Sequence, residues 1–190
     1  MLEEAIDVAA SAGLFNTVQW ALADLGIAHL HQGDPDAARD AFDRASAASE
    51  HIGDGAGTVL AAYGYGLLAQ TQGDWAEAKE RYSSALDGFL RLSTPVPQGL
   101  ALAGLARCDE AADDLAAARE RYEQVLARGR AIGEPALVAT ALEGLGRVAT
   151  RDGSPGEGRR LLDEAAVLRQ ERSRPAPPFE RRDLEDLVSG

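Results

Sequence analysis

The stretch TQGDWAEAKERY, residues 71–82, decides the fold because variants of it occur at four places in the chain. The other three are HQGDPDAARDAF (31–42), AADDLAAARERY (111–122) and RDGSPGEGRRLL (151–162), so the copies are evenly spaced. In each copy a glycine or aspartate comes third, and the next residue is Asp or Ser, which commonly caps a helix N-terminus. Two copies then have proline, which is favoured at the first helical position. Each copy therefore predicts that one helix ends, the chain turns and a second helix begins.

Small and large residues recur at fixed places around these turns. Small residues precede each turn, at Gly26, Gly66, Ala106 and Gly146. Small residues also follow each turn, at Ala38, Ala78, Ala118 and Gly158. Larger residues come next, at Phe42, Tyr82, Tyr122 and Leu162. Apolar residues on both sides of each turn are spaced by three and four, as in amphipathic helices. We expect the small pair to let two helix backbones approach closely, while the large residues fill the space to the next repeat. The pattern predicts an all-α chain of antiparallel helix pairs.

These repeats resemble the tetratricopeptide repeat family over about residues 14–172. Four positions of the family consensus are matched. The eighth position is matched by Gly26, Gly66 and Gly146, and the twentieth by Ala38, Ala78 and Ala118. The twenty-fourth is matched by Phe42, Tyr82 and Tyr122, and the twenty-seventh by Ala45, Ala85 and Ala165. The spacing of the copies is longer than the family's usual period of about 34 residues, and the family's late proline is replaced by Glu50, Leu90, Arg130 and Gln170. The resemblance implies a right-handed superhelical solenoid of antiparallel helix pairs, whose first helices line a concave face.

The register divides the chain into segments. We expect four repeats, at about 14–53, 54–93, 94–133 and 134–172, followed at 173–190 by a Pro-rich break and a short capping helix that carries Phe179, Leu184, Leu187 and Val188. Residues 1–13 align with 42–53, so they predict the second helix of a repeat whose first helix is missing. Leu2 and Ala5 would then lack a partner helix. Either the chain was cut from a longer protein or this segment is a natural half-repeat cap.

The pattern G-x-G-x-x-A occurs twice and raises an alternative, a phosphate-binding loop of a nucleotide-dependent enzyme. It is formed by Gly64, Gly66 and Ala69 and again, two repeats later, by Gly144, Gly146 and Ala149. A dinucleotide fold needs one such pattern after a true strand. Here the pattern repeats on a helical register, so we interpret it as two glycines within a helix. We expect those at the family's sixth position, Gly64, Gly104 and Gly144, to open a groove.

Composition restricts the class of protein further. The net charge of −12, without a long basic run, argues against direct nucleic-acid binding and against anionic membranes. No apolar run approaches the roughly 18 residues that would span a bilayer, and the N-terminal residues do not look like a signal peptide. The single cysteine, Cys108, occupies a core position and fits a reducing cytosol. Arginine greatly outnumbers lysine, which suggests a GC-rich bacterial genome.

No set of residues predicts catalysis, a metal or a cofactor. His29 and His31 are two residues apart on a helix and point to different faces, so they do not form the i, i+4 pair that binds a metal. We therefore expect a cytoplasmic, non-enzymatic repeat module that binds a protein or an effector. Similar long-period repeats occur in bacterial signal-transducing regulators, including the maltose-regulon activator type and actinobacterial activators. That likeness implies the C-terminal sensor part of a larger transcriptional regulator, whereas a free-standing adaptor that binds extended peptides is the alternative.

The resemblance also implies a binding surface on the concave face. Family positions carried onto this sequence give Trp20, Ile27, Leu60, Tyr63, Leu67, Arg107 and Arg147. The surface would be apolar and aromatic at one end, with two arginines at the other that could bind a carboxylate. It suggests a protein or peptide partner, or an amphipathic acidic small effector. Alternatively, Trp20 and Tyr63 pack between repeats and the arginines pair with Glu110 and Glu143. The sequence does not indicate the oligomeric state.

Overall fold

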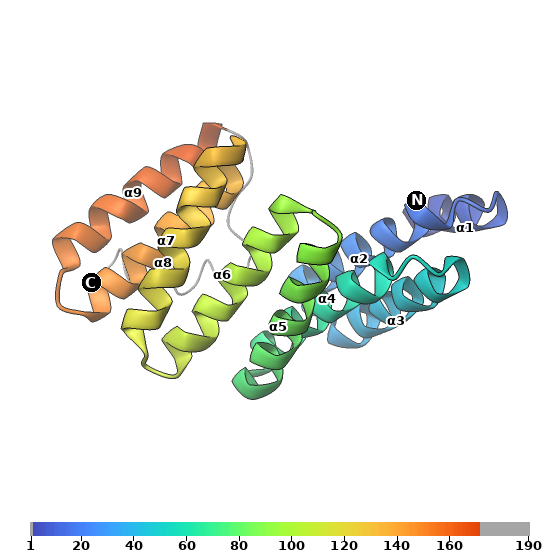
Figure 1. Ribbon diagram of the computed structural model, residues 1–190, viewed down its shortest axis with the longest axis horizontal. Coiled ribbons are helices and arrows are strands. Elements are labelled where there is room, and N and C mark those ends of the chain that lie inside the picture. The colour runs from blue at the N-terminus through green and yellow to red at the C-terminus, as the bar shows by residue number, and fades with distance from the viewer. Residues whose placement is uncertain (1, 172–190) are drawn as a thin grey trace. The chain divides into compact units, whose positions relative to one another are not determined.

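The computed structural model describes residues 2–171 of the chain, and these residues form α-helices joined by short turns (Figure 1). The helices are α1 (Leu2–Ser11), α2 (Phe15–Gln32), α3 (Pro35–Ile52), α4 (Ala56–Gln72), α5 (Trp75–Arg91), α6 (Pro95–Ala111), α7 (Leu115–Ile132), α8 (Pro135–Arg151) and α9 (Pro155–Glu171). The described range contains no β-strand, which confirms the all-α prediction. The predicted capping helix with Phe179, Leu184, Leu187 and Val188, and the side chains of Leu2 and Ala5, lie outside what the structure describes.

The turns form as the repeated stretch predicts. Asp34, Asp74 and Asp114 each accept a hydrogen bond, at 3.0 Å, from the backbone N–H three residues later. The residue before each cap has a left-handed backbone, with φ of +79° at Gly33 and +61° at Asp113. Glycine adopts this conformation without steric cost, while aspartate is one of the few other residues that tolerate it. These caps and turns set where the second helix of each pair begins.

The chain divides into two compact units, Met1–Leu92 and Ser93–Gly190. In the first unit α2 pairs with α3 and α4 with α5, α3 and α2 both pack on α4, and α1 lies on α2. Ile6 of α1 joins a core cluster with Val18, Leu22 and Leu25 of α2. In the second unit α6 pairs with α7 and α8 with α9, and α8 packs on both α6 and α7. Each unit therefore buries its helices mainly against their neighbours in sequence.

A polar contact joins three helices of the first unit. The buried amide of Gln19 on α2 donates to Asp54 Oδ2 at 2.8 Å and accepts from the backbone N–H of Gly57 on α4, also at 2.8 Å. Ser49 of α3 donates to Asp54 Oδ1 at 3.0 Å. Desolvation by its neighbours would raise the pKa of Asp54, but the hydrogen bonds from Gln19, the Ala56 backbone and Ser49 bring it below its ordinary value. The ionised carboxylate thus ties α2 and α3 to the start of α4.

Glycines let the aromatic rings sit between helices. A Cβ atom added to Gly66 would lie 2.6 Å from Cδ1 of Tyr82, the large residue of the same helix pair. One added to Gly64 would lie 2.5 Å from Cζ of Phe42, which belongs to the preceding pair. Gly144 meets the ring of Tyr122 in the same way. The prediction that Gly64 and Gly144 open a groove is therefore wrong, because rings of the preceding helix pair fill the space.

The helix α4 also excludes a phosphate-binding loop. Gly64 and Gly66 lie inside one continuous helix that spans Ala56–Gln72, and the segment before them is not a strand. Since a mid-helix glycine costs about 1 kcal/mol relative to alanine, these residues are explained by the ring contacts and not by a ligand.

We predict that Gly66→Leu destabilises the protein, because the new side chain must displace the Tyr82 ring. Overpacking of this kind typically costs about 1–3 kcal/mol, which thermal or urea unfolding followed by circular dichroism would detect. Gly156→Leu is the matched control, since Gly156 also lies in a helix but a Cβ there meets no atom within 4 Å. Equal stability of the two variants would contradict the proposed ring–glycine contact.

Candidate functional site

The residues predicted to form the binding surface differ in their exposure. In the first unit Trp20 is 39% exposed, whereas Leu60 and Leu67 are buried. Ile27 and Tyr63 are half-buried. The Tyr63 ring packs near the rings of Tyr82 and Phe89 on α5, at centroid distances of 5.8 and 6.2 Å. The most accessible residue of the predicted surface in this unit is therefore Trp20 on α2, while Ile27 and Tyr63 are accessible only in part.

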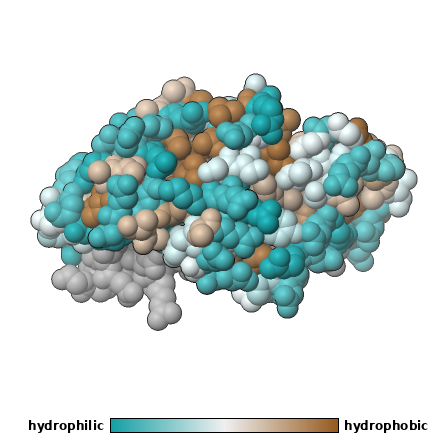
Figure 2. Space-filling view, turned by 60° about the horizontal axis from the view of Figure 1, so that its bottom comes forward, coloured by the Kyte–Doolittle hydropathy of each residue, from teal (hydrophilic) through white to brown (hydrophobic). Residues whose placement is uncertain are grey.

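Exposed hydrophobic residues are scattered over the described surface. Figure 2 shows hydrophobic residues reaching the surface in patches between hydrophilic ones. The large apolar side chains that are exposed are Val8, Leu14, Trp20, Ile52, Leu90, Ile132 and Val167. Of these residues, Trp20 alone belongs to the predicted surface.

The two predicted arginines of the second unit are engaged with one carboxylate, that of Glu110 on α6. Arg147 reaches from α8 and donates from Nη2 to Oε1 at 3.1 Å and from Nε to Oε2 at 3.2 Å. Arg107 is one turn before Glu110 on α6 and contacts Oε2 at 3.4 Å. Arg147 is buried and the Arg107 side chain is only 15% exposed. The predicted pairing of Arg147 with Glu143 does not occur, because Glu143 binds Arg169 of α9 at 2.8 Å.

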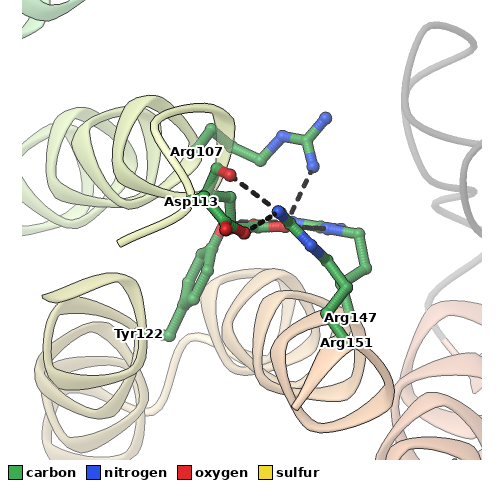
Figure 3. A network of polar contacts seen from close by, with 6 residues as sticks. Arg107, Asp113, Tyr122, Arg147 and Arg151 are labelled. Atoms are coloured by element: carbon green, nitrogen blue, oxygen red, sulfur yellow. Dashed lines mark hydrogen bonds and ion pairs between the residues drawn. The ribbon is translucent and has the colours of Figure 1, made fainter. Parts of the chain in front are cut away.

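The contact extends to the neighbouring helices (Figure 3). The buried hydroxyl of Tyr122 on α7 donates to Glu110 Oε1 and accepts from Arg147 Nη2 at 2.9 Å. Arg151, one turn after Arg147, donates to the backbone carbonyl of Glu110 at 2.8 Å and to Asp113 Oδ1 at 2.7 Å. Three helices thus meet at one carboxylate, and Arg151 also stabilises the left-handed turn at Asp113.

The electrostatics of this network keep Glu110 ionised. Burial alone would raise the pKa of Glu110, but the positive charges of Arg147 and Arg107, with hydrogen bonds from Arg147 and Tyr122, bring the pKa below its ordinary value. Burial is the main cause of the raised pKa of Tyr122. The tyrosine therefore stays neutral and donates a hydrogen bond to the ionised carboxylate. Neither arginine is available to a ligand without competing with Glu110.

The equivalent positions two repeats earlier are apolar, whereas one repeat earlier Tyr82 donates to Gln70 at 2.8 Å. Moving back by two repeats from Glu110, Tyr122 and Arg147 gives Leu30, Phe42 and Leu67, all of which are buried. The two triads occupy the same places in their helix pairs, and each triad is internally matched. The sequence contains this signal, but it appears only when three positions on three helices are compared together.

We predict that Glu110→Leu lowers the free energy of unfolding by about 3–5 kcal/mol, the usual cost of leaving a buried charge without its partner. The triple variant Glu110→Leu, Tyr122→Phe, Arg147→Leu reproduces the apolar triad of the first unit, and should recover most of that loss. Urea unfolding of the wild type, the single variant and the triple variant measures both effects. Additive losses in the triple variant would show that the three side chains do not act as a unit.

Acid provides an independent check on the same network. Because the folded pKa of Glu110 is lowered, its ionised form stabilises the protein above the unfolded pKa of about 4.3. This contribution is lost as the pH falls through the lower folded value. The stability of the wild type relative to the triple variant should therefore decrease below about pH 4. A difference that does not change with pH would contradict an ionised Glu110.

Comparison with known proteins identifies the repeats. Two family models, both described as tetratricopeptide repeat, match residues 17–91 and residues 97–177. No curated protein matches the chain at a significant level. The family's members are generally non-enzymatic scaffolds for protein–protein interaction, and no catalytic family is indicated.

Solved structures show the same fold at low sequence identity. The crystal structure of BtubC (BKLC) from P. vanneervenii has a TM-score of 0.64 and 16% identity, over 93% of this chain and 81% of that one. A crystal structure of nearly identical TPR-like repeats of a putative kinesin light chain from Podospora anserina has a TM-score of 0.57 and 16% identity, over 90% of this chain and 85% of that one. With helix pairs from α2 to α9 and two matching family models, this chain belongs to the tetratricopeptide repeat family.

Proposed function

We propose that this chain is a non-enzymatic binding module whose partner is a protein, and that it contacts this partner through α2, the first helix of its first pair. The observation that carries the proposal is the exposed side chain of Trp20, two turns before the half-buried Ile27 on the same side of a helix whose opposite face forms the core. Exposed aromatic side chains are enriched among the residues that dominate binding energy at interfaces.

The arrangement favours a protein partner over the acidic small effector. Such an effector was predicted from Arg107 and Arg147, but both guanidinium groups already bind Glu110. An acidic ligand would have to displace a buried carboxylate that also accepts a hydrogen bond from Tyr122. Leu60, Tyr63 and Leu67 would support the binding surface from behind, since all three are buried or half-buried.

We further propose that the module is the sensor part of a larger bacterial transcriptional regulator. The support is the sequence likeness of its repeats to those of regulators that combine an ATPase module, a repeat array and a DNA-binding domain. A free-standing adaptor that binds extended peptides is equally compatible with the fold. Mapping the transcript and reading frame around Met1 separates the two: ATPase and DNA-binding motifs in the same polypeptide are expected for the regulator, and an isolated reading frame would contradict it.

We predict that a photo-crosslinking amino acid at position 20 or 27 captures a protein partner in the cell of origin. The same amino acid at Val167, which is 53% exposed on the second helix of the last pair, is the control and should capture little. Trp20→Ala should then weaken binding to the captured partner by at least about 1 kcal/mol, or fivefold. Equal capture from all three positions, or unchanged affinity in a folded Trp20→Ala variant, would contradict the proposed surface.

A further inference from the structure

The exposed face of α2 has covered counterparts elsewhere in the repeat register. Trp20 and Asp24 correspond to Leu60 and Gly64 on α4, one repeat later. On α4, Leu60 is buried and Gly64 lies against the Phe42 ring of α3, because α2 and α3 both pack on this helix. On α2, the helix α1 covers the side of Val18 and Leu22 through Ile6. Within residues 2–171, no helix packs on α2 in the place that α2 itself occupies on α4.

The residues on this face combine apolar surface with one unmatched charge. Asp24 lies one turn from Trp20 and one turn from Ile27 on the same side of α2, where residues three and four apart are neighbours. Within residues 2–171, the carboxylate of Asp24 forms no hydrogen bond or ion pair with another residue. Burial by its neighbours raises the pKa of Asp24. A nearby cation would offset the cost of this partial burial.

The charge around this face favours a basic partner. Residues 1–92 contain 14 Asp and Glu against 5 Lys and Arg, a net charge of −9, whereas residues 93–190 contain 17 against 14, a net charge of −3. Most of the negative charge of the chain is therefore carried by the unit that holds Trp20 and Asp24. Such a potential attracts a basic segment and repels an acidic one.

We propose that the face formed by Trp20, Asp24 and Ile27 of α2, together with the adjoining edge of α1, binds an amphipathic helix of a partner protein. The apolar side of this helix packs on Trp20 and Ile27, and a Lys or Arg on its border pairs with Asp24. The occupant is a helix because helices cover the equivalent face of α4. This inference rests on the proposed function as a binding module, and it specifies the chemistry of the partner.

The experiment is a display selection against the full-length chain. The probe is a library of amphipathic helical peptides five turns long, with a fixed leucine face and border positions that vary among Lys, Arg, Glu and Gln. Enrichment of Lys and Arg at the border is the expected result. Binding of the selected peptide is then followed by fluorescence anisotropy, and by Trp20 emission in a Trp75→Phe background.

Substitutions place the peptide on this face. Trp20→Ala and Asp24→Asn should each weaken binding at least about fivefold, and Asp24→Lys should reverse the preference, so that the peptide with Glu at its border binds better than the one with Lys. Asp36→Asn and Ile132→Ala are the matched controls, because Asp36 is another exposed acid and Ile132, at 40%, is as exposed as Trp20. Both controls should leave the dissociation constant within about twofold, as expected for residues outside an interface. Circular dichroism confirms that every variant is folded.

Three results would overturn the inference. The first is enrichment without a basic preference. The second is a selected peptide whose affinity is unchanged by Trp20→Ala and Asp24→Lys in folded protein. The third is a dimer of this chain that Trp20→Ala dissociates, because a second copy would then be the occupant. The first two results leave the proposed function unaffected, since it fails separately if crosslinkers at positions 20 and 27 capture no other protein.

Discussion

The contact between an aromatic ring and a glycine on the neighbouring helix is the constraint on which each unit depends. Phe42 touches Gly26 of its own pair and Gly64 of the next, so one ring sets the distances among α2, α3 and α4. A methyl group at either glycine would overlap the ring. The place of Gly26 holds glycine again at Gly66 and Gly146 and alanine at Ala106, and this need for little side-chain volume explains why small residues are the most regular feature of the sequence.

The positions of Glu110, Tyr122 and Arg147 hold polar side chains, whereas the equivalent positions two repeats earlier hold apolar ones. The apolar residues are Leu30, Phe42 and Leu67, and all three are buried. In the second unit a carboxylate, a phenol and a guanidinium group occupy the same positions, and each satisfies the others. Replacing a buried ion pair by apolar residues is often neutral or stabilising, so stability alone does not explain the polar version. The hydrogen bonds between Arg147 and Glu110 instead determine which turn of α8 packs against which turn of α6.

Sequence reasoning could predict the turns because their signals are local. The caps at Asp34, Asp74 and Asp114 act over three residues, and the left-handed backbone of Asp113 follows from its alignment with glycines. Contacts between helices were harder to predict. The small residue at Gly64 suggested an open groove, since its partner Phe42 lies on another helix in the preceding pair. The burial of Arg147 depends on Glu110, 37 residues earlier, and only the packed helices bring the two together.

The matched triads have an evolutionary consequence. Glu110 and Tyr122 belong to one helix pair and Arg147 to the next, so a recombination event between these pairs would separate residues that must be inherited together. Joining the first unit's Leu30 and Phe42 to a pair that carries Arg147 would leave a guanidinium group facing only apolar side chains. A crossover at Leu92–Ser93 keeps both triads whole. The sequence repeats once in every helix pair. Among descendants of an ancestral duplication, however, recombination should exchange two helix pairs together.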